Sequence, residues 1–239
     1  SPSPAVIYAH GGGMILGGVA TFDKVVAAYV AGTGVPFLAV DYRLAPEHPH
    51  PNPVNDVYAA VNWLVAHSKE LGVDNSRIGI MGDSAGGGLA VAATLLARQE
   101  DRPRLAKLIL LSPMLDDRTV SADEHLTPFL SWNTTDNETG WQALLHSSGG
   151  REMMTETSTP GRMVNAASMP PLYIEVGELD LFRNESIELA TKFYKSVSVQ
   201  SSMCIQDALM GLTSFSREEL AYAKGHLRIE TESLRAYIR

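Results

Sequence analysis

One serine of the chain has neighbours that suit a nucleophile. Ser84 lies in Gly82–Gly86 (GDSAG), between an apolar run at 77–81 and a helical pattern at 86–98. A sharp turn from strand to helix exposes such a serine, and its strained backbone requires small flanking residues. The amide of Ala85, at the positive end of the helix, can bind an oxygen that gains negative charge. The pattern predicts acyl transfer on Ser84, and the plain alternative is a glycine-rich turn with an incidental serine.

A second glycine-rich segment predicts the partner of this turn. His10 and three glycines follow the apolar run at 5–9. Consecutive glycines let backbone amides approach a ligand closely, and this HGGG pattern forms part of the oxyanion hole in lipases and esterases. We expect Gly12 and Gly13 to donate N–H groups beside Ala85, with His10 as a structural anchor of the loop. A phosphate-binding loop is the alternative, but no Gly-Lys-Ser/Thr follows.

Strand-length apolar runs alternate with helical patterns around these motifs. Strands are expected at 5–9, 35–40, 77–81, 105–111 and 172–176, and helices at 22–31, 54–68, 86–98, 185–195 and 218–237. Apolar strands separated by helices predict a mostly parallel sheet that is covered by helices on both faces.

The alternation stops between about residues 117 and 169, where the chain is polar and carries no strand pattern. A long irregular stretch in a compact domain is usually a lid or an insertion. We therefore expect one domain, residues 1–239, with a cap-like insertion at about 117–169. Trp132, Trp141 and the residues around Phe129 either line a pocket there or simply pack the insertion.

Composition excludes several classes of partner and site. The 239 residues carry a formal net charge of −8, which argues against nucleic acid or an anionic membrane as the main partner. No stretch reaches the length of a membrane span. The single cysteine, Cys204, excludes an internal disulfide framework and a cysteine-rich metal site, and it fits a cytoplasmic location.

The two motifs, spaced as they are, resemble those of the hormone-sensitive-lipase family of carboxylesterases. A third segment strengthens the resemblance, because Asp41–Pro49 (DYRLAPEHP) matches a hallmark that braces the oxyanion loop in that family. The resemblance implies an α/β-hydrolase fold and carboxylic esters of short to medium acyl chains as substrates. It implies no metal and no organic cofactor.

The resemblance also suggests the acidic member of a catalytic triad. Asp180 falls just after the run at 172–176, where the family carries the acid that orients the histidine. The plain alternative for Asp180 is a helix cap. Asp83 and Glu178 are nearby acids that match no position of the family's pattern.

Two features depart from the family. The chain begins where the family has its third strand, so the N-terminal strands and cap helices are expected to be absent, in a fragment or in a shortened natural protein. Met210 stands where the family carries its catalytic histidine, in the motif His-Gly-Phe. His226 is the only histidine after Asp180, and its polar helical surroundings indicate a solvated face.

A compensated frameshift would explain the missing histidine. When each codon of residues 201–212 starts one base earlier, synonymous codons exist that encode Val-Val-His-Val-His-Pro-Gly-Arg-Pro-His-Gly-Phe, which is very like the family's sequence. The helical pattern from residue 218 onward again resembles the family. Our hypothesis is that a slip across about 201–216, in the gene or in its sequencing, has overwritten the base.

Two functions follow from these residues. With a histidine present, the chain is expected to hydrolyse small-molecule esters through an acyl-enzyme on Ser84. As written, loss of the histidine costs on the order of 10⁶-fold in turnover, which favours a ligand-binding pseudo-hydrolase, as the gibberellin receptors are within this family. An inactive fragment is the third possibility, and the sequence predicts no oligomeric state.

Overall fold

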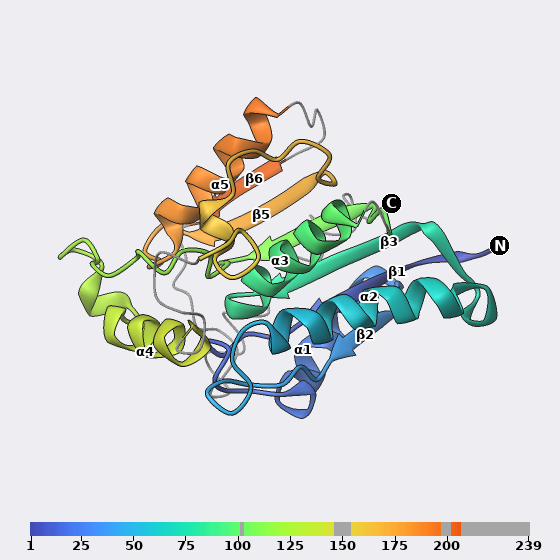
Figure 1. The fold of residues 1–239 in the computed structure, drawn as a ribbon, viewed down its shortest axis with the longest axis horizontal. Helices are drawn as coiled ribbons and strands as arrows, with labels where there is room; N and C mark the ends of the chain where they lie inside the picture. The colour runs from blue at the N-terminus through green and yellow to red at the C-terminus, as the bar shows by residue number, and fades with distance from the viewer. Residues whose placement is uncertain (101–102, 146–153, 197–201, 207–239) are drawn as a thin grey trace.

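The computed structural model describes residues 1–100, 103–145, 154–196 and 202–206 (Figure 1). Strands and helices alternate along most of this chain. The strands are β1 (Ser3–Ala9), β2 (Phe37–Val40), β3 (Val73–Asp83), β4 (Lys107–Leu111), β5 (Leu172–Gly177) and β6 (Ser202–Gln206). The helices are α1 (Val19–Thr33), α2 (Asn52–Leu71), α3 (Ala85–Gln99), α4 (Thr134–Leu145) and α5 (Arg183–Lys195), with short 3₁₀ turns at Thr127–Phe129 and Pro160–Arg162.

The six strands form one sheet in the order β2-β1-β3-β4-β5-β6, and every neighbouring pair is parallel. The predicted parallel sheet is confirmed. Because all strands point the same way, their carboxyl ends meet at one edge. In Figure 1 the chain enters at the right and α4 lies at the opposite, left-hand end, beyond that edge. Ligands of open parallel sheets bind at this edge.

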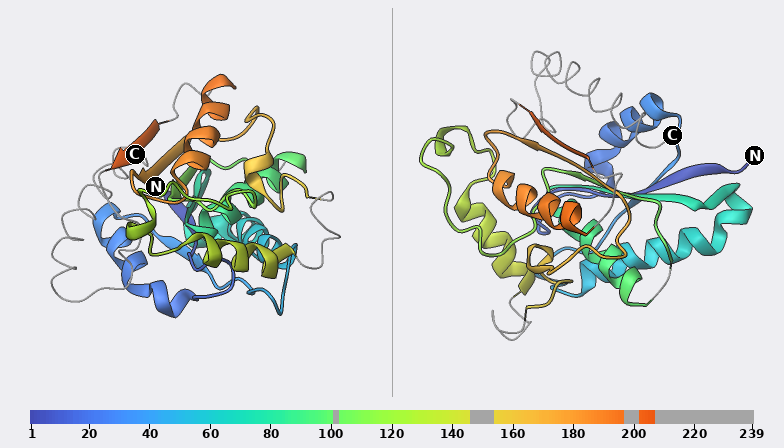
Figure 2. Two further views of the ribbon diagram at one scale, coloured as in Figure 1. Left: turned by 90° about the vertical axis from the view of Figure 1, so that its left-hand side faces the viewer. Right: turned by 90° about the horizontal axis from the view of Figure 1, so that it is seen from above.

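Helices cover both faces of the sheet, as the apolar strands predicted. Figure 2 shows α1 on one face and α2, α3 and α5 on the other. The core is divided accordingly, because alternate residues of a strand point to opposite faces. Ile7 and Ala9 of β1 pack in the cluster that includes α2, α3 and α5, whereas Val6 and Tyr8 pack with Phe22 of α1.

The long helix α2 illustrates how the sequence sets an element. Its buried residues recur every three or four positions, which places them on the single face that meets the sheet. They are Pro53, Val54, Val57, Val61, Leu64 and Ser68. Gly72 ends the helix in the left-handed conformation at φ 67°, and its N–H donates to the carbonyl groups of Ser68 and Lys69.

The described residues of the polar region between β4 and β5, 112–145 and 154–171, contain no strand, as expected, but they do contain a helix. Asn133 precedes α4, and its side-chain oxygen accepts the N–H groups of Thr135 (2.8 Å) and Asp136 (3.0 Å). Trp141 and Leu144 of α4 are buried against the main core. Among the described residues, no helix is both long enough and apolar enough to cross a bilayer.

Candidate active site

Ser84 occupies the predicted turn between β3 and α3. Its backbone angles, φ 51° and ψ −117°, are rare for a residue with a side chain. A Cβ on Gly82 would collide with the carbonyl of Gly86, and a Cβ on Gly86 would collide with the carbonyl of Ala9. The glycines on either side of the serine are therefore required by close backbone contacts. Strain of this kind costs about 1–3 kcal/mol and is concentrated at functional sites.

The neighbouring strand β4 and the loop that follows it fix the backbone of Ser84 on both sides. The N–H of Ser84 donates to the carbonyl of Leu111 at 2.8 Å, and the carbonyl of Ser84 accepts the N–H of Met114 at 2.9 Å. Within the described residues, no side-chain hydrogen bond occupies the Ser84 hydroxyl. The side chain is half-buried, so the hydroxyl is held at the edge of the sheet and remains accessible.

The glycine loop after β1 lies beside the serine. A Cβ on Gly11 would be 3.4 Å from Cβ of Ser84, which places the two segments in contact. Gly12 and Gly13 take φ values of 120° and 60°, conformations that favour glycine. In the part of the chain that the structure describes, no hydrogen bond takes the N–H groups of Gly12, Gly13 or Ala85.

His10 anchors this loop. Its Nδ1 donates to the carbonyl of Gly11 at 2.7 Å, and its ring stacks on Tyr42 at a centroid distance of 4.2 Å. The Tyr42 hydroxyl in turn donates to the carbonyl of His10 at 2.7 Å. Burial lowers the pKa of His10, which favours the neutral ring. His10 is only 1% exposed, so this arrangement suits a structural residue and not a base.

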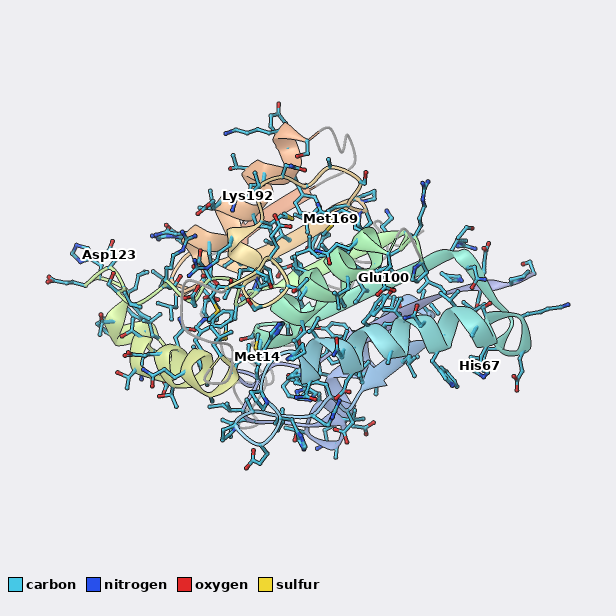
Figure 3. All side chains as sticks on the ribbon, in the orientation of Figure 1. Met14, His67, Glu100, Asp123, Met169 and Lys192 are labelled. Carbon is cyan, nitrogen blue, oxygen red and sulfur yellow. The ribbon has the colours of Figure 1, made fainter. Side chains whose placement is uncertain are left out.

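The segment 41–49 braces the same loop from the other side. Asp41 accepts the N–H of Val19 at 3.2 Å, at the start of α1. The N–H of Ala45 donates to the carbonyl of Met14, the residue that follows the three glycines, at 3.0 Å. Met14, labelled in Figure 3, is fully buried and its methyl group reaches Gly88 of α3. The loop is thus held between this segment and α3.

Asp180 follows β5 at the same edge of the sheet, and it is completely buried. One carboxylate oxygen accepts the N–H of Phe182 at 2.8 Å, whereas Oδ2 has no hydrogen-bond partner among the described residues. Burial raises the pKa of Asp180 to about 6, against the lowering effect of the Phe182 N–H and the Ser112 hydroxyl. A buried carboxylate oxygen without a donor is costly, so this oxygen suits a further N–H group.

The two other acids near the site have different surroundings. Glu178 is exposed. Asp83 is turned toward the α1 side of the sheet, where one of its oxygens accepts the Tyr8 hydroxyl at 2.7 Å. Burial and the nearby Glu175 raise the pKa of Asp83 to about 7, and the Tyr8 hydroxyl opposes the shift. Among Asp83, Glu178 and Asp180, only Asp180 combines full burial with a place beyond the end of a strand.

Sequence reasoning missed a fourth acid, Glu185 of α5. Its carboxylate accepts the N–H of Leu115 at 2.8 Å and the hydroxyl of Thr119 at 2.7 Å. These hydrogen bonds join the helix that follows Asp180 to the start of the insertion. Glu185 lies on the apolar face of the helical pattern at 185–195. A charged residue on such a face is rarely buried without a partner, and this was the signal that could have identified it.

The three aromatic residues of the insertion have different positions. Trp141 is buried and packs the insertion onto the core, whereas Phe129 is 47% exposed. Trp132 is half-buried, and its six-membered ring lies so close to Gly13 that a Cβ on this glycine would overlap it. The sequence left open whether these aromatic residues pack the insertion or line a pocket. The structure adds the contact of Trp132 with the glycine loop, which the sequence did not predict.

The expected place of the general base, Met210, and the late histidine, His226, both lie outside the described residues, as does most of the segment at 201–216. Within the described part of the chain, no histidine forms a hydrogen bond with Ser84. The geometry therefore combines a strained serine, three available N–H donors and a buried acid at one edge of the sheet.

Comparison with known proteins gives a consistent result. Residues 6–207 match the family described as the alpha/beta hydrolase fold. The chain is 37% identical over 185 residues to Carboxylesterase NlhH of Mycobacterium tuberculosis, covering 76% of this chain and 58% of that protein. It is 34% identical over 190 residues to Esterase LipI of the same organism, covering 77% of this chain and 58% of that protein. The chain thus spans less than two thirds of the length of these relatives.

Solved structures of esterases share the fold. A bacterial heroin esterase superposes with a TM-score of 0.85 at 32% identity, covering 100% of this chain and 76% of that chain. EstE1, a thermostable carboxylesterase cloned from a metagenomic library, superposes with a TM-score of 0.86 at 27% identity, covering 100% of this chain and 81% of that chain. The chain belongs to the α/β-hydrolase fold family, within the group of carboxylesterases related to hormone-sensitive lipase.

Proposed function

We propose that the chain is a serine carboxylesterase that forms an acyl-enzyme on Ser84. One observation carries the proposal: the accessible Ser84 hydroxyl lies beside a loop whose N–H groups, at Gly12 and Gly13, are unoccupied among the described residues. Together with Ala85, these N–H groups can stabilise the negative oxygen of a tetrahedral intermediate. The loss of one such donor typically costs 10²–10³-fold in turnover.

The proposed reaction has two half-reactions. In the first, a general base removes the Ser84 proton while Oγ attacks the ester carbonyl carbon, and the resulting oxyanion is bound by Gly12, Gly13 and Ala85. The intermediate then collapses, and the leaving alcohol takes the proton from the base. In the second half-reaction the base deprotonates water, which attacks the acyl group and releases the carboxylic acid and the Ser84 hydroxyl.

Asp180 is proposed as the acid that orients the base. Its buried Oδ2 has no partner among the described residues and can accept an imidazole N–H. An acid in this position selects the correct ring tautomer and stabilises the charged ring. The hydrogen bond to the Phe182 N–H fixes the carboxylate, so Oδ2 is presented in one direction.

The base itself is proposed to be the histidine that a compensated frameshift at about 201–216 has replaced in the written sequence. Both Met210 and His226 lie outside the described residues. Intact mass and fragmentation of the tryptic peptide 196–217 from the purified protein test the hypothesis. A peptide that contains His-Gly-Phe supports a sequencing error, and a peptide that matches the written residues rejects it.

The proposed substrates are carboxylic esters with short to medium acyl chains, and the insertion at about 117–169 is proposed to act as a cap over them. Two observations support a small-molecule ester: the site lies at the sheet edge, where ligands of such folds bind, and the relatives are named as esterases. These relatives give no support to the receptor-like alternative.

Hydrolysis of p-nitrophenyl acetate and p-nitrophenyl butyrate by the chain and by Ser84→Ala tests the proposal. We expect saturable hydrolysis that Ser84→Ala abolishes, and stoichiometric labelling of Ser84 by a fluorophosphonate, seen as one mass addition. Equal background rates in both proteins, with no labelling of Ser84, would overturn the proposal for this polypeptide.

A further inference from the structure

The backbone of Gly13 contacts two parts of the insertion. The six-membered ring of Trp132 lies so close that a Cβ on Gly13 would overlap it. Helix α4 approaches the carbonyl of Gly13, and a Cβ on Gly140 would be only 2.8 Å from that oxygen. The same position on Gly140 is 3.5 Å from the Trp132 ring, so the three residues form one packed group.

The glycine loop is held partly by its own hydrogen bonds and partly by packing against other segments. Gly12 and Gly13 use backbone conformations that other residues rarely adopt, and glycine loses more conformational freedom on folding than any other residue. The carbonyl of Gly12 accepts the N–H groups of Ile15 (3.0 Å) and Leu16 (2.8 Å), which closes the turn. These hydrogen bonds, and the one from His10 Nδ1 to the carbonyl of Gly11, orient the peptide planes that carry the N–H groups of Gly13 and Gly12. The carbonyl of Gly13, in contrast, accepts no hydrogen bond among the described residues, so packing against the neighbouring segments holds this end of the loop.

The segment that follows Trp132 is fixed by hydrogen bonds and by packing. The next residue, Asn133, caps α4 through its side chain and also accepts the N–H of Asn137 on its carbonyl at 2.9 Å. Trp141, two turns into α4, is 3% exposed and anchors the helix in the core. The Trp132 indole therefore contacts Gly13 from a position that the insertion determines.

We propose that Trp132 is a positioning residue, which holds Gly13 so that the N–H groups of the glycine loop point at the developing oxyanion. The inference rests on the proposed function and adds a residue to it. Oxyanion donors act because they are oriented before charge develops. A loop whose Gly13 backbone can shift into the space left by the Trp132 ring loses that advantage, even when substrate still binds.

The test compares Trp132→Ala with a matched control, Trp63→Ala. Trp63 is 47% exposed on α2 and stacks on His67, and in Figure 3 His67 lies at the opposite end of the molecule from Asp123 of the insertion. Two readouts are used: amide hydrogen exchange of peptides that cover residues 10–18, and kcat and KM for p-nitrophenyl acetate. The acetyl group is small, so the measured kcat and KM do not depend on a direct contact between Trp132 and a long acyl chain.

We expect Trp132→Ala to speed exchange in residues 10–18 and to lower kcat by about 10- to 100-fold, with KM changed less than threefold. Trp63→Ala should change neither. Trp132→Phe, which keeps an aromatic ring, should restore part of both effects. Melting temperatures show whether each variant is folded.

Several results would overturn the inference. Unchanged exchange in residues 10–18 of Trp132→Ala is one, and an unchanged kcat in an active preparation is another. An effect of Trp63→Ala as large as that of Trp132→Ala also rejects it. If the wild-type chain hydrolyses no ester and Ser84 is not labelled, the proposed function fails, and the exchange measurement alone decides whether Trp132 holds the loop.

Discussion

Glu185 of α5 accepts a hydrogen bond from the backbone N–H of Leu115 at 2.8 Å, across 70 residues of chain. The second carboxylate oxygen accepts the Thr119 hydroxyl at 2.7 Å. Burial raises the pKa of Glu185 to about 8, assisted by the nearby Asp116 and opposed by these two hydrogen bonds. The link between the acid-bearing loop and the insertion therefore contains a carboxyl group that titrates far from its ordinary range.

This relationship predicts a pH-dependent stability. The unfolded Glu185 has its ordinary pKa of 4.5, and the folded one about 8, so the folded state binds the proton more tightly between these values. The free energy of unfolding contributed by this group is present below pH 4.5 and declines as pH rises through 8. Glu185→Gln keeps an acceptor for Leu115 and should melt several degrees higher than wild type at pH 8.5, with the difference vanishing near pH 4.5.

Thermal unfolding between pH 4.5 and 8.5 measures this effect. Glu188→Gln is the control, because Glu188 is 58% exposed on the same helix and pairs with Lys192. Its curve should follow that of the wild type. Parallel pH curves for wild type and Glu185→Gln would refute the prediction.

The strained backbone of Ser84 predicts a difference in stability between two variants at this position. Ser84→Gly relieves the strain of φ 51°, whereas Ser84→Ala retains it. We expect Ser84→Gly to be more stable by about 1 kcal/mol, which corresponds to about 2–4 °C in melting temperature for a chain of this size. Ser186, which lies within α5, is the control, and there the difference in melting temperature should be reversed. Glycine destabilises a helix interior, so Ser186→Gly should melt below Ser186→Ala.

Substitution of Gly12 in the glycine loop is expected to reduce activity by more than the backbone strain of a positive φ can explain. A Cβ on Gly12 would collide with the carbonyl of Leu16, so Gly12→Ala must displace the loop. We expect kcat/KM for p-nitrophenyl acetate to fall at least 100-fold. Gly34→Ala is the matched control, because Gly34 also has a positive φ of 70° but its Cβ would meet no atom within 4 Å. That variant should lose some stability and keep its activity.

Asp180 and Glu178 differ in burial, and this predicts different effects of their amides. In a preparation that hydrolyses p-nitrophenyl acetate, Asp180→Asn should lower kcat by about 10⁴-fold, because an amide favours the wrong tautomer of the base. The Asn oxygen can still accept the Phe182 N–H, so the fold is expected to persist. Glu178→Gln, at an exposed position, should leave kcat unchanged. Equal kcat values in wild type and Asp180→Asn would exclude Asp180 as the acid.

Much of the fold could be predicted from the sequence, because buried parallel strands read as uninterrupted apolar runs. The runs at 5–9 and 172–176 each lie within an observed strand. The run at 77–81 was too short, since β3 begins at Val73 and passes through exposed polar residues, across which its pairing with β1 shifts register. Apolar patterning reports burial, and it misses the part of a strand that extends into solvent.

The elements that escaped prediction depend on tertiary contacts. Helix α4 begins with Thr-Thr-Asp-Asn-Glu-Thr-Gly, which has little apolar periodicity. Its stability comes from the Asn133 cap and from burial of Trp141, neither of which is a periodic signal. Strand β6 was not predicted, and it is defined by its pairing with β5 at the edge of the sheet.

The site was predictable where its geometry requires particular residues next to one another in the sequence. Close backbone contacts around Ser84 and in the glycine loop allow only small residues, and these residues are recognised in the sequence as short motifs. The contacts of Glu185 with Leu115 and of Trp132 with Gly13 leave none, because each joins segments that meet only in the folded chain. The roles proposed for Asp180 and for the missing base rest on the family's pattern, and they stay predictions.

The close packing of α3 decides where this protein can be redesigned. Cβ atoms on Gly86 and Gly88 would collide with the main-chain oxygens of Ala9 and Met114, and main chain cannot move aside as a flexible side chain does. Libraries that randomise these glycines will consist almost entirely of misfolded clones. Diversity is better introduced at Leu16 and Phe129, which are 58% and 47% exposed, because a changed side chain there meets fewer neighbouring atoms.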